Sequence, residues 1–220
     1  MRPSIEITAD GSPTLYLAEL DEHYHSVHGA VTESRHVYID CGLVHRASRS
    51  SENSALRVFE VGFGTGLNAT LSAMTGIDCR YTSIEKFPLD VRIADELDFG
   101  ESIDHAMLHA AHRAPWGTHE RLTPAFELLK IRGDFTRENI EGQFDVIFMD
   151  AFAPEKQPEM WSEPILAKLA AMLAPGGVLT TYCAKGHIRR TLRSQGLTAE
   201  RLPGPPGGKR EILRLTKPVI

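Results

Sequence analysis

Hydrophobic and polar positions along the chain repeat with two periods, that of a strand and that of a helix. Alternating or continuous apolar runs predict strands at residues 14–20, 37–43, 57–61, 79–84, 125–131, 146–149, 178–183, 197–202 and 211–216. Apolar residues spaced three or four apart predict helices at residues 67–74, 88–97, 161–173 and 186–194. From residue 57 onward strands and helices alternate, which favours an α/β fold with a mostly parallel sheet.

The two ends of the chain depart from this alternation. Two predicted strands precede it, so we expect a small N-terminal β appendage and a serine-rich linker over residues 1–54, followed by one α/β domain over residues 55–220. The last two strands are joined by glycine- and proline-rich residues 203–210. Such a connection predicts an antiparallel C-terminal hairpin.

Composition and charge narrow the class of protein. Apolar residues make up 42% of the chain, but no run is long enough to span a membrane and the N-terminus does not have the pattern of a signal peptide. The three cysteines are far apart, which predicts reduced thiols in a cytoplasmic protein. Residues 185–217 carry a net charge of +7 within a chain of −5, which suits contact with a polyanion, although solvated surface charges would give the same count.

The most informative stretch is the glycine-rich turn after residues 57–61. It has the pattern Glu60-x-Gly62-x-Gly64-x-Gly66, and a predicted helix follows. Glycines let the backbone turn sharply beside a ligand, and the helix start offers free N–H groups. The dinucleotide fingerprint would need a glycine at Leu67, so a nicotinamide or flavin site, or a turn without any ligand, is a weaker alternative. The spacing is that of S-adenosylmethionine-dependent methyltransferases.

Acidic residues follow three further predicted strands. Glu85 lies 19 residues beyond Gly66, where a carboxylate can accept hydrogen bonds from both ribose hydroxyls. Asp134 and Phe135 suit an adenine, through its amino group and its ring, but a turn aspartate beside a core phenylalanine is an equal alternative. Asp150 ends the apolar strand 146–149 and is expected beside the same cofactor.

Histidines at residues 23, 25 and 28, and again at 105, 109 and 112, raise the question of a metal site. The second set has helical spacing. Methyl transfer requires no metal and surface histidines are common, so we expect no metal.

The chain resembles the methyltransferase domain of the bacterial MnmC family of tRNA 5-methylaminomethyl-2-thiouridine biosynthesis proteins, in its stand-alone, MnmD-like form. The resemblance rests on residues 24–26, 33–38, 59–68, 84–89, 150–154 with Trp161, 182–186 with Arg189 and Arg190, and 208–211. It implies a class I methyltransferase fold, with a Rossmann-like sheet, and S-adenosyl-L-methionine as cofactor. It also adds Asn68 and Lys86 to the expected cofactor site.

The reaction that the resemblance implies is methylation of the primary amine of 5-aminomethyl-2-thiouridine at the tRNA wobble position. Asp150 is the candidate that receives the amine and helps remove its proton. Phe152 and Trp161 are candidates to stack on the flipped-out base, although core packing of Trp161 is an equal alternative.

The tRNA itself is the expected partner, through its anticodon region. Phosphate contacts are expected from Lys185, Arg189, Arg190 and Arg193, while Lys209 and Arg210 fit either a cofactor lid or an RNA contact. The enzymes that make the aminomethyl precursor are a possible functional link. Two rival functions stay open: a methyl- or aminopropyltransferase acting on a free small amine, and a non-catalytic adenosine-binding module.

Overall fold

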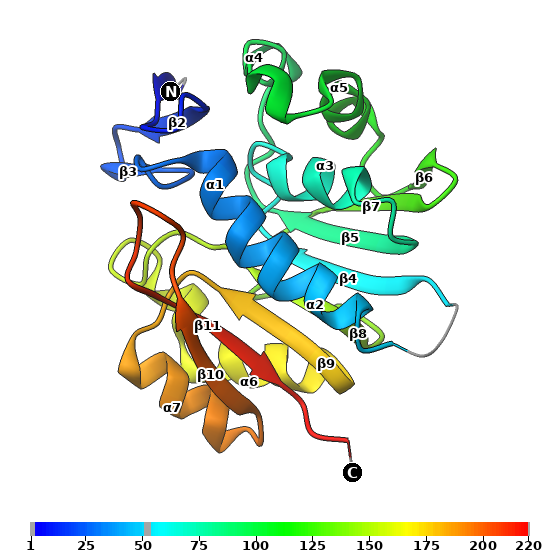
Figure 1. Cartoon of the computed structure of the whole chain (residues 1–220), viewed down its shortest axis with the longest axis vertical. Coiled ribbons are helices and arrows are strands. Elements are labelled where there is room, and N and C mark those ends of the chain that lie inside the picture. Colours follow the sequence, from blue (N-terminus) through cyan, green and yellow to red (C-terminus); the bar gives the residue numbers. More distant parts are fainter. Residues whose placement is uncertain (1–2, 51–53, 220) are drawn as a thin grey trace.

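The computed structural model of the chain describes residues 3–50 and 54–219 and places them around one large sheet (Figure 1). The sheet has eight strands in the order β10-β11-β9-β8-β4-β5-β7-β6. Their bounds are β4 (Leu56–Val61), β5 (Cys79–Glu85), β6 (His119–Thr123), β7 (Phe126–Arg132), β8 (Phe144–Met149), β9 (Leu173–Thr181), β10 (Thr198–Pro203) and β11 (Glu211–Thr216).

The inner part of the sheet is parallel and its two edges are antiparallel. Strands β9, β8, β4, β5 and β7 pair in parallel. At one edge β11 and β10 pair antiparallel as a hairpin, and at the other β6 pairs antiparallel with β7. The mostly parallel sheet and the C-terminal hairpin are therefore confirmed, and β6 is a strand that the hydrophobic pattern did not predict.

Alternation along the central strands divides the core into two layers. Val58 and Val146 point to one face of the sheet, and Phe59 and Ile147 to the other. The second face is covered by α6 and α7. The first is covered by α3 and by a long helix formed by α1, η1 and α2. The helices are α1 (Ala30–Ser34), η1 (Arg35–Val44), α2 (His45–Ala47), α3 (Leu67–Met74), α4 (Val91–Ala94), α5 (His105–Arg113), α6 (Glu163–Met172) and α7 (Gly186–Ser194), with short 3₁₀ turns η2 (Gly100–Ser102) and η3 (Pro158–Trp161).

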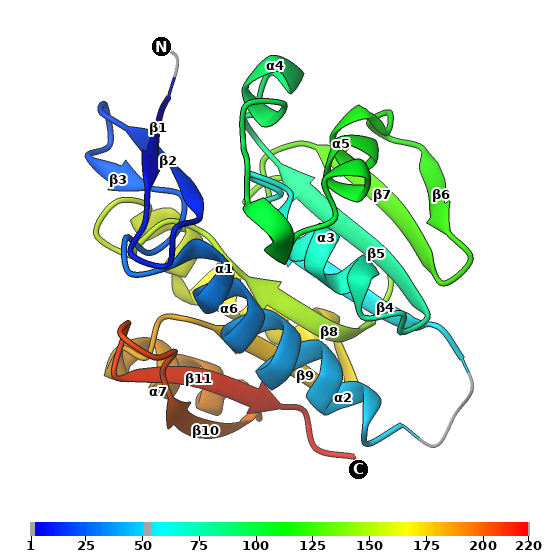
Figure 2. The ribbon, with the colours of Figure 1, turned by 45° about the horizontal axis from the view of Figure 1, so that its top comes forward.

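The long helix corrects the prediction of a strand at residues 37–43. Figures 1 and 2 show it crossing the face of the sheet. Its middle part is wound with π-helical hydrogen bonds, so that Val37, Tyr38 and Leu43 all face the sheet. Gly42 permits a close approach, because a Cβ there would lie 3.0 Å from the side chains of both Phe148 and Thr180. The apolar run is thus one buried face of a helix.

The N-terminal residues form a separate small sheet of β1 (Ser4–Ile7), β2 (Pro13–Leu17) and β3 (Glu22–His23), of which β2 overlaps the strand predicted at residues 14–20. The long helix that follows packs on the large sheet rather than within this appendage. Part of the predicted linker, residues 51–53, lies outside the described residues, and the division of the chain at residue 54 stays a prediction. The helix predicted at 88–97 is shorter and covers α4 alone, and Asp90 sets its start by accepting from the Arg92 N–H.

Candidate active site

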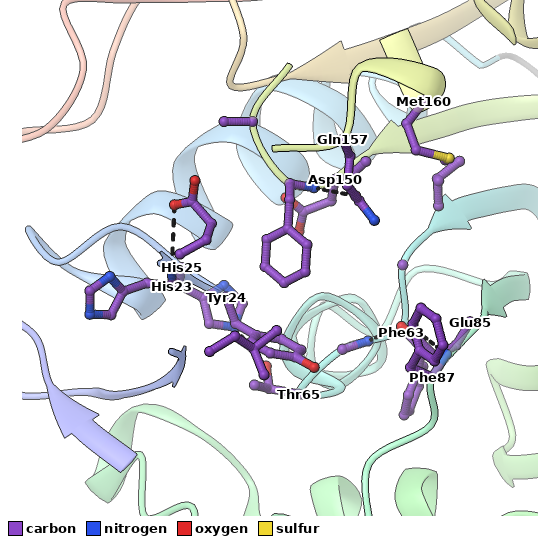
Figure 3. A pocket seen from close by; sticks show the side chains of 18 of the residues that line it. His23, Tyr24, His25, Phe63, Thr65, Glu85, Phe87, Asp150, Gln157 and Met160 are labelled. Carbon is purple, nitrogen blue, oxygen red and sulfur yellow. Dashed lines mark hydrogen bonds between the residues drawn. The ribbon is translucent and has the colours of Figure 1, made fainter. Parts of the chain in front are cut away.

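The carboxyl ends of the parallel strands open into a cavity of about 1460 Å³. Gly62, Glu85, Asp134 and Asp150 line it, each at or just after the end of a different strand. The N-terminal sheet, the C-terminal hairpin and the loops that follow β5 and β8 contribute further walls. In Figure 3, Tyr24, Thr65 and Asp150 surround one part of the cavity, and Glu85 and Phe87 line another. The strand-end residues predicted to bind a cofactor are therefore gathered in one place.

The glycine turn needs glycine at each of its three positions. Gly62, Gly64 and Gly66 have φ angles of +92°, +51° and +72°, which side chains rarely adopt. A Cβ on Gly62 would lie 3.1 Å from the Asp150 carbonyl oxygen, and one on Gly64 would lie 3.2 Å from the Tyr24 ring. The turn therefore brings bare backbone against the cavity wall, as a bound nucleoside requires.

Two histidines hold this turn in place. His112 Nε2 lies 2.8 Å from the Thr65 carbonyl oxygen, which can only accept, so Nε2 is the donor. His25 Nε2 lies 2.7 Å from Thr65 Oγ1. Burial lowers the pKa of each imidazole to about 4, so both are neutral at pH 7. Their role here is to fix Thr65.

Glu85 links the second strand to the glycine turn. Its Oε2 accepts from the Gly64 N–H at 3.1 Å, and its Oε1 accepts from the Phe87 N–H at 2.8 Å. Phe87 is 68% exposed although its ring lines the cavity. An exposed aromatic ring beside the carboxylate is the kind of surface on which an adenine stacks. The hydrophobic pattern gave no reason to single out Phe87.

Asp134 and Phe135 lie in the cavity wall, but their side chains already have partners. Asp134 accepts from the Thr136 N–H and hydroxyl and pairs with Lys86 at 3.0 Å. The Thr136 hydroxyl and Lys86 hold its pKa down, at about 2, against the effect of burial. Phe135 is 3% exposed and packs near Phe59. This geometry matches the alternative of a turn aspartate beside a core phenylalanine. Contact of the two residues with an adenine stays a prediction.

Asp150 is held by two hydrogen bonds from different elements. The Tyr38 hydroxyl donates to Oδ1 at 2.6 Å, and the Asn68 amide donates to Oδ2 at 2.8 Å. Burial raises the pKa of Asp150 to about 6, and the carboxylate of Glu33 adds to that rise. The two hydrogen bonds and the charge of Lys209 act in the opposite direction. At pH 7 the group is mostly a carboxylate, and the two hydrogen bonds fix its orientation. Its pKa is close enough to neutral for it to take up a proton from a nearby group.

Glu60 lies behind the turn and does not line the cavity. It is fully buried, and its Oε2 accepts from the Ser83 hydroxyl at 2.7 Å. Burial raises its pKa to about 8, so it holds a proton at neutral pH. Within the described part of the chain its Oε1 has no hydrogen-bond partner. Direct cofactor contact by Glu60 stays a prediction, and its side chain is not part of the cavity lining.

The two aromatic candidates for base stacking are in different places. Phe152 lines the cavity, and its ring meets that of Tyr24 edge-on with centroids 5.2 Å apart. Trp161 is 5% exposed, and its indole N–H donates to the Phe152 carbonyl at 2.7 Å. Trp161 therefore packs as a core residue that holds the Phe152 loop, which matches the core-packing alternative, and base stacking by Trp161 stays a prediction.

The basic residues divide into those at the cavity and those on α7. Lys185 and Lys209 line the cavity, and Lys185 pairs with Glu155. On α7, Arg190 and Arg193 are exposed while Arg189 is half-buried. Arg210 is exposed beside Lys209. Within residues 3–50 and 54–219, no carboxylate lies within ion-pair distance of Arg190, Arg193 or Arg210.

Sequence reasoning missed several residues that shape the site, although most fall within the stretches that carried the resemblance. Tyr38 was assigned to a strand, which concealed its contact with Asp150. Glu33 and Tyr182 were quoted without a role, and both line the cavity. In the sequence, each of them was a polar or aromatic residue within a stretch that carried the resemblance. That alone does not show which residue it contacts.

Two of the histidines that raised the question of a metal site each pair with a different carboxylate. His23 Nε2 lies 2.9 Å from Glu6 Oε2, and His109 Nδ1 lies 2.7 Å from Asp95 Oδ1. Among the residues that the structure describes, no group of three or more His, Cys, Asp or Glu could hold an ion. All three cysteines are free thiols. In the same part of the chain, no helix has the length and apolar character needed to cross a membrane.

Comparison with protein families and curated proteins gives consistent matches. A family model described as "S-adenosyl-L-methionine-dependent methyltransferase" matches residues 117–218. The tRNA 5-methylaminomethyl-2-thiouridine biosynthesis bifunctional protein MnmC of Pseudomonas fluorescens (strain Pf0-1) is 33% identical over 214 residues, or 88% of this chain and 32% of that protein. MnmC of Pseudomonas paraeruginosa (strain PA7) is also 33% identical, over 86% of this chain and 31% of that protein. The chain spans about a third of the length of these relatives.

Solved structures agree with these matches. MnmC2 from Aquifex aeolicus superposes with a TM-score of 0.79 and 25% identity, over 99% of this chain and 72% of that one. Magnesium protoporphyrin IX methyltransferase from Synechocystis with bound S-adenosylmethionine superposes with a TM-score of 0.54 and 13% identity, over 86% of this chain and 81% of that one. The second match shows a shared fold alone.

Proposed function

The chain is an S-adenosyl-L-methionine-dependent methyltransferase related to part of the MnmC proteins, and from that premise we propose that it methylates the primary amine of 5-aminomethyl-2-thiouridine at the wobble position of tRNA. The product is 5-methylaminomethyl-2-thiouridine. The names of the matched relatives refer to the biosynthesis of this nucleoside. The substrate assignment rests on the chemistry of the cavity together with that relationship.

The residues around the cavity fit the cofactor. The positive φ angles of the glycine turn, with Glu85 fixed beside it, leave bare backbone next to a carboxylate suited to ribose hydroxyls. When bound, S-adenosyl-L-methionine supplies a sulfonium methyl group, which a neutral amine takes as the carbon–sulfur bond breaks and its electron pair stays on sulfur. What the protein must supply is placement of the amine and a route for its proton.

The observation that carries the proposal is the position of Asp150. It follows the strand next to the glycine turn, and Tyr38 and Asn68 fix both of its oxygens. An alkyl amine with a pKa of about 10 is mostly protonated at pH 7 and has no free lone pair. A fixed carboxylate orients this ammonium and accepts its proton as the lone pair becomes available. With a pKa near 6, Asp150 can then pass the proton to water.

A tRNA fits the remaining surface better than a free small amine does. Arg190, Arg193 and Arg210 are exposed cations without a carboxylate partner within the described residues, as phosphate contacts require. The flipped-out base would meet Phe152 and Tyr24 at the cavity. We propose that the anticodon region binds here and that a separate enzyme supplies the aminomethyl group. With such a substrate, we propose a cytoplasmic location.

The test is incubation of the protein with methyl-labelled cofactor and tRNA that carries 5-aminomethyl-2-thiouridine, followed by nucleoside analysis. We expect the label in 5-methylaminomethyl-2-thiouridine alone. Label in a free polyamine added without RNA, and none in the tRNA, would support the rival function of a small-amine transferase.

A further inference from the structure

The ammonium group of Lys209 occupies a site inside the cavity that is built for a cation. Lys209 Nζ lies 3.5 Å from the centroid of the Tyr182 ring and 3.6 Å from Glu33 Oε2. An aromatic face and a carboxylate together bind an ammonium by cation–π attraction and ion pairing. The same chemistry recognises a protonated aminomethyl group.

The walls of this site are rigid. The Tyr182 hydroxyl donates to the Ala151 carbonyl at 2.8 Å, which fixes the ring directly beside Asp150. Glu33 is 7% exposed, and its Oε1 accepts from the Ser26 N–H at 3.2 Å. Its Oε2 is buried and has no hydrogen bond in the described residues, so Lys209 is the cation that faces it. A buried carboxylate oxygen that lacks a hydrogen bond favours a closer donor.

Lys209 itself is less enclosed than the residues around it. It lies on the connection between β10 and β11, and its side chain is 44% exposed. The connection is closed at its base by the Gly204 N–H, which donates to the Arg210 carbonyl at 2.9 Å, so Lys209 can move without the strands separating. The pair joins a half-exposed ammonium to a buried carboxylate, so its loss would leave Glu33 without a counter-charge. Lys209 can therefore leave at small cost when another cation takes its place.

We propose that the Tyr182 ring, Glu33 and Asp150 form the binding site for the ammonium group of the substrate, and that Lys209 fills this site until the substrate displaces it. This inference rests on the proposed function for the identity of the amine. In the free enzyme Lys209 balances the charge of the two carboxylates. When the substrate enters, its ammonium takes over that contact next to Asp150, where its proton is to be removed.

The electrostatics of Asp150 agree with one shared site. Glu33 raises the pKa of Asp150 and Lys209 lowers it, so all three groups act on one another. When Lys209 leaves, the pKa of Asp150 rises and the carboxylate becomes a better proton acceptor. When the substrate ammonium arrives, the two carboxylates regain a counter-charge. The exchange thus keeps a cation beside Asp150 both before and after substrate entry.

The test is binding of two free nucleosides, 5-aminomethyl-2-thiouridine and its neutral 5-hydroxymethyl analogue, to wild type and to Lys209→Met. Removing the internal competitor should lower the Kd of the amine about ten-fold, as when a site that is nine-tenths occupied becomes free. The Kd of the alcohol should stay unchanged. Glu33→Gln should weaken the amine alone. Lys185→Met is the control, because it removes another ammonium group of this cavity, the one that pairs with Glu155. It should not lower the Kd of the amine.

Weaker or unchanged amine binding in Lys209→Met would overturn the inference, as would equal tightening of both nucleosides. Methylammonium, titrated as a plain cation, separates this result from the fate of the proposed function. If wild type fails to methylate tRNA but Lys209→Met still binds methylammonium more tightly, the cation site stands and the substrate assignment is wrong. If tRNA is methylated but Lys209→Met binds methylammonium no more tightly than wild type, the substrate assignment stands and the cation site is wrong.

Discussion

The Tyr38 hydroxyl donates a hydrogen bond to Asp150 Oδ1 at 2.6 Å, although 112 residues separate the two in sequence. Tyr38 belongs to the long helix that crosses the sheet, and Asp150 follows β8 at the sheet's carboxyl edge. The helix thus reaches into the active site and fixes the carboxylate that faces the cavity. The orientation of Asp150 depends on this packing as well as on its own strand.

Replacing Asp150 with alanine should cost most of the turnover and little of the cofactor affinity. The variant loses the group that orients the amine and accepts its proton, a contribution of about 100-fold or more. Turnover of tRNA carrying the aminomethyl group and the Kd of S-adenosylhomocysteine are the two measurements. Wild-type turnover in the variant would remove Asp150 from the mechanism.

Replacing Tyr38 with phenylalanine should move the acid limb of the pH–rate profile to higher pH. In wild type, Asp150 is protonated below its pKa of about 6, so kcat should fall as pH drops through that value. The Tyr38 hydrogen bond holds this pKa down, and its loss raises the pKa further. The measurement is kcat between pH 5 and 9.

Tyr16→Phe is the matched control for this experiment. Tyr16 also donates its hydroxyl to an aspartate, Asp21, at 2.9 Å, but on the surface of the N-terminal sheet. Its removal should leave the acid limb in place. A limb that stays at the wild-type pH in Tyr38→Phe, or that moves equally in both variants, would show that the hydrogen bond does not control Asp150.

The central strands and the last helix were predictable because their patterns are unambiguous. The continuous apolar run in β8 and the glycines after β4 fit few other structures, and α7 begins and ends at the predicted residues. Residues 37–43 were not predictable, since a short apolar run has the same pattern in a buried strand and on one face of a helix. The packing of the run on the sheet, with Gly42 against Phe148 and Thr180, identifies it as a helix face.

The candidate site was predictable only on one side. The strand-end residues Glu85, Asp134 and Asp150 were identified because a parallel sheet brings its carboxyl ends together. The side formed by Glu33, Tyr38 and Lys209 depends on where the long helix and the C-terminal hairpin pack. No local pattern encodes that placement, so these partners required the structure.

Replacing Gly66 with alanine should weaken cofactor binding about ten-fold or more, a cost of 1.4 kcal/mol or above. A Cβ at Gly66 would lie 2.9 Å from His112 Nε2, which holds the Thr65 carbonyl. Gly76→Ala is the control, because Gly76 has a similar φ of +69° but nothing within 4 Å of its Cβ. Both variants should lose similar stability from backbone strain, about 1 kcal/mol.

Calorimetric titration with S-adenosylhomocysteine and thermal unfolding separate the two effects. A lower Tm in both variants, with a weaker Kd in Gly66→Ala alone, is the expected result. Equal Kd values in the two variants would mean that the contact between His112 and the turn does not shape the cofactor site.

Removing the charges of Arg190 and Arg193 should weaken tRNA binding and flatten its salt dependence. Each arginine that contacts a phosphate contributes about 1 to the slope of log K against log salt concentration, so the double glutamine variant should lose a slope of about 2. The matched control is the double variant Arg113→Gln and Arg121→Gln. This variant removes the same charge, but its two arginines pair with Asp95 and Glu127. Arg121 lies on β6, at the edge of the sheet opposite the C-terminal hairpin.

Filter binding across a salt series should distinguish the two faces, because long-range attraction responds to total charge alone and a phosphate contact responds to position. An equal loss of slope in both double variants would show that α7 does not meet the RNA.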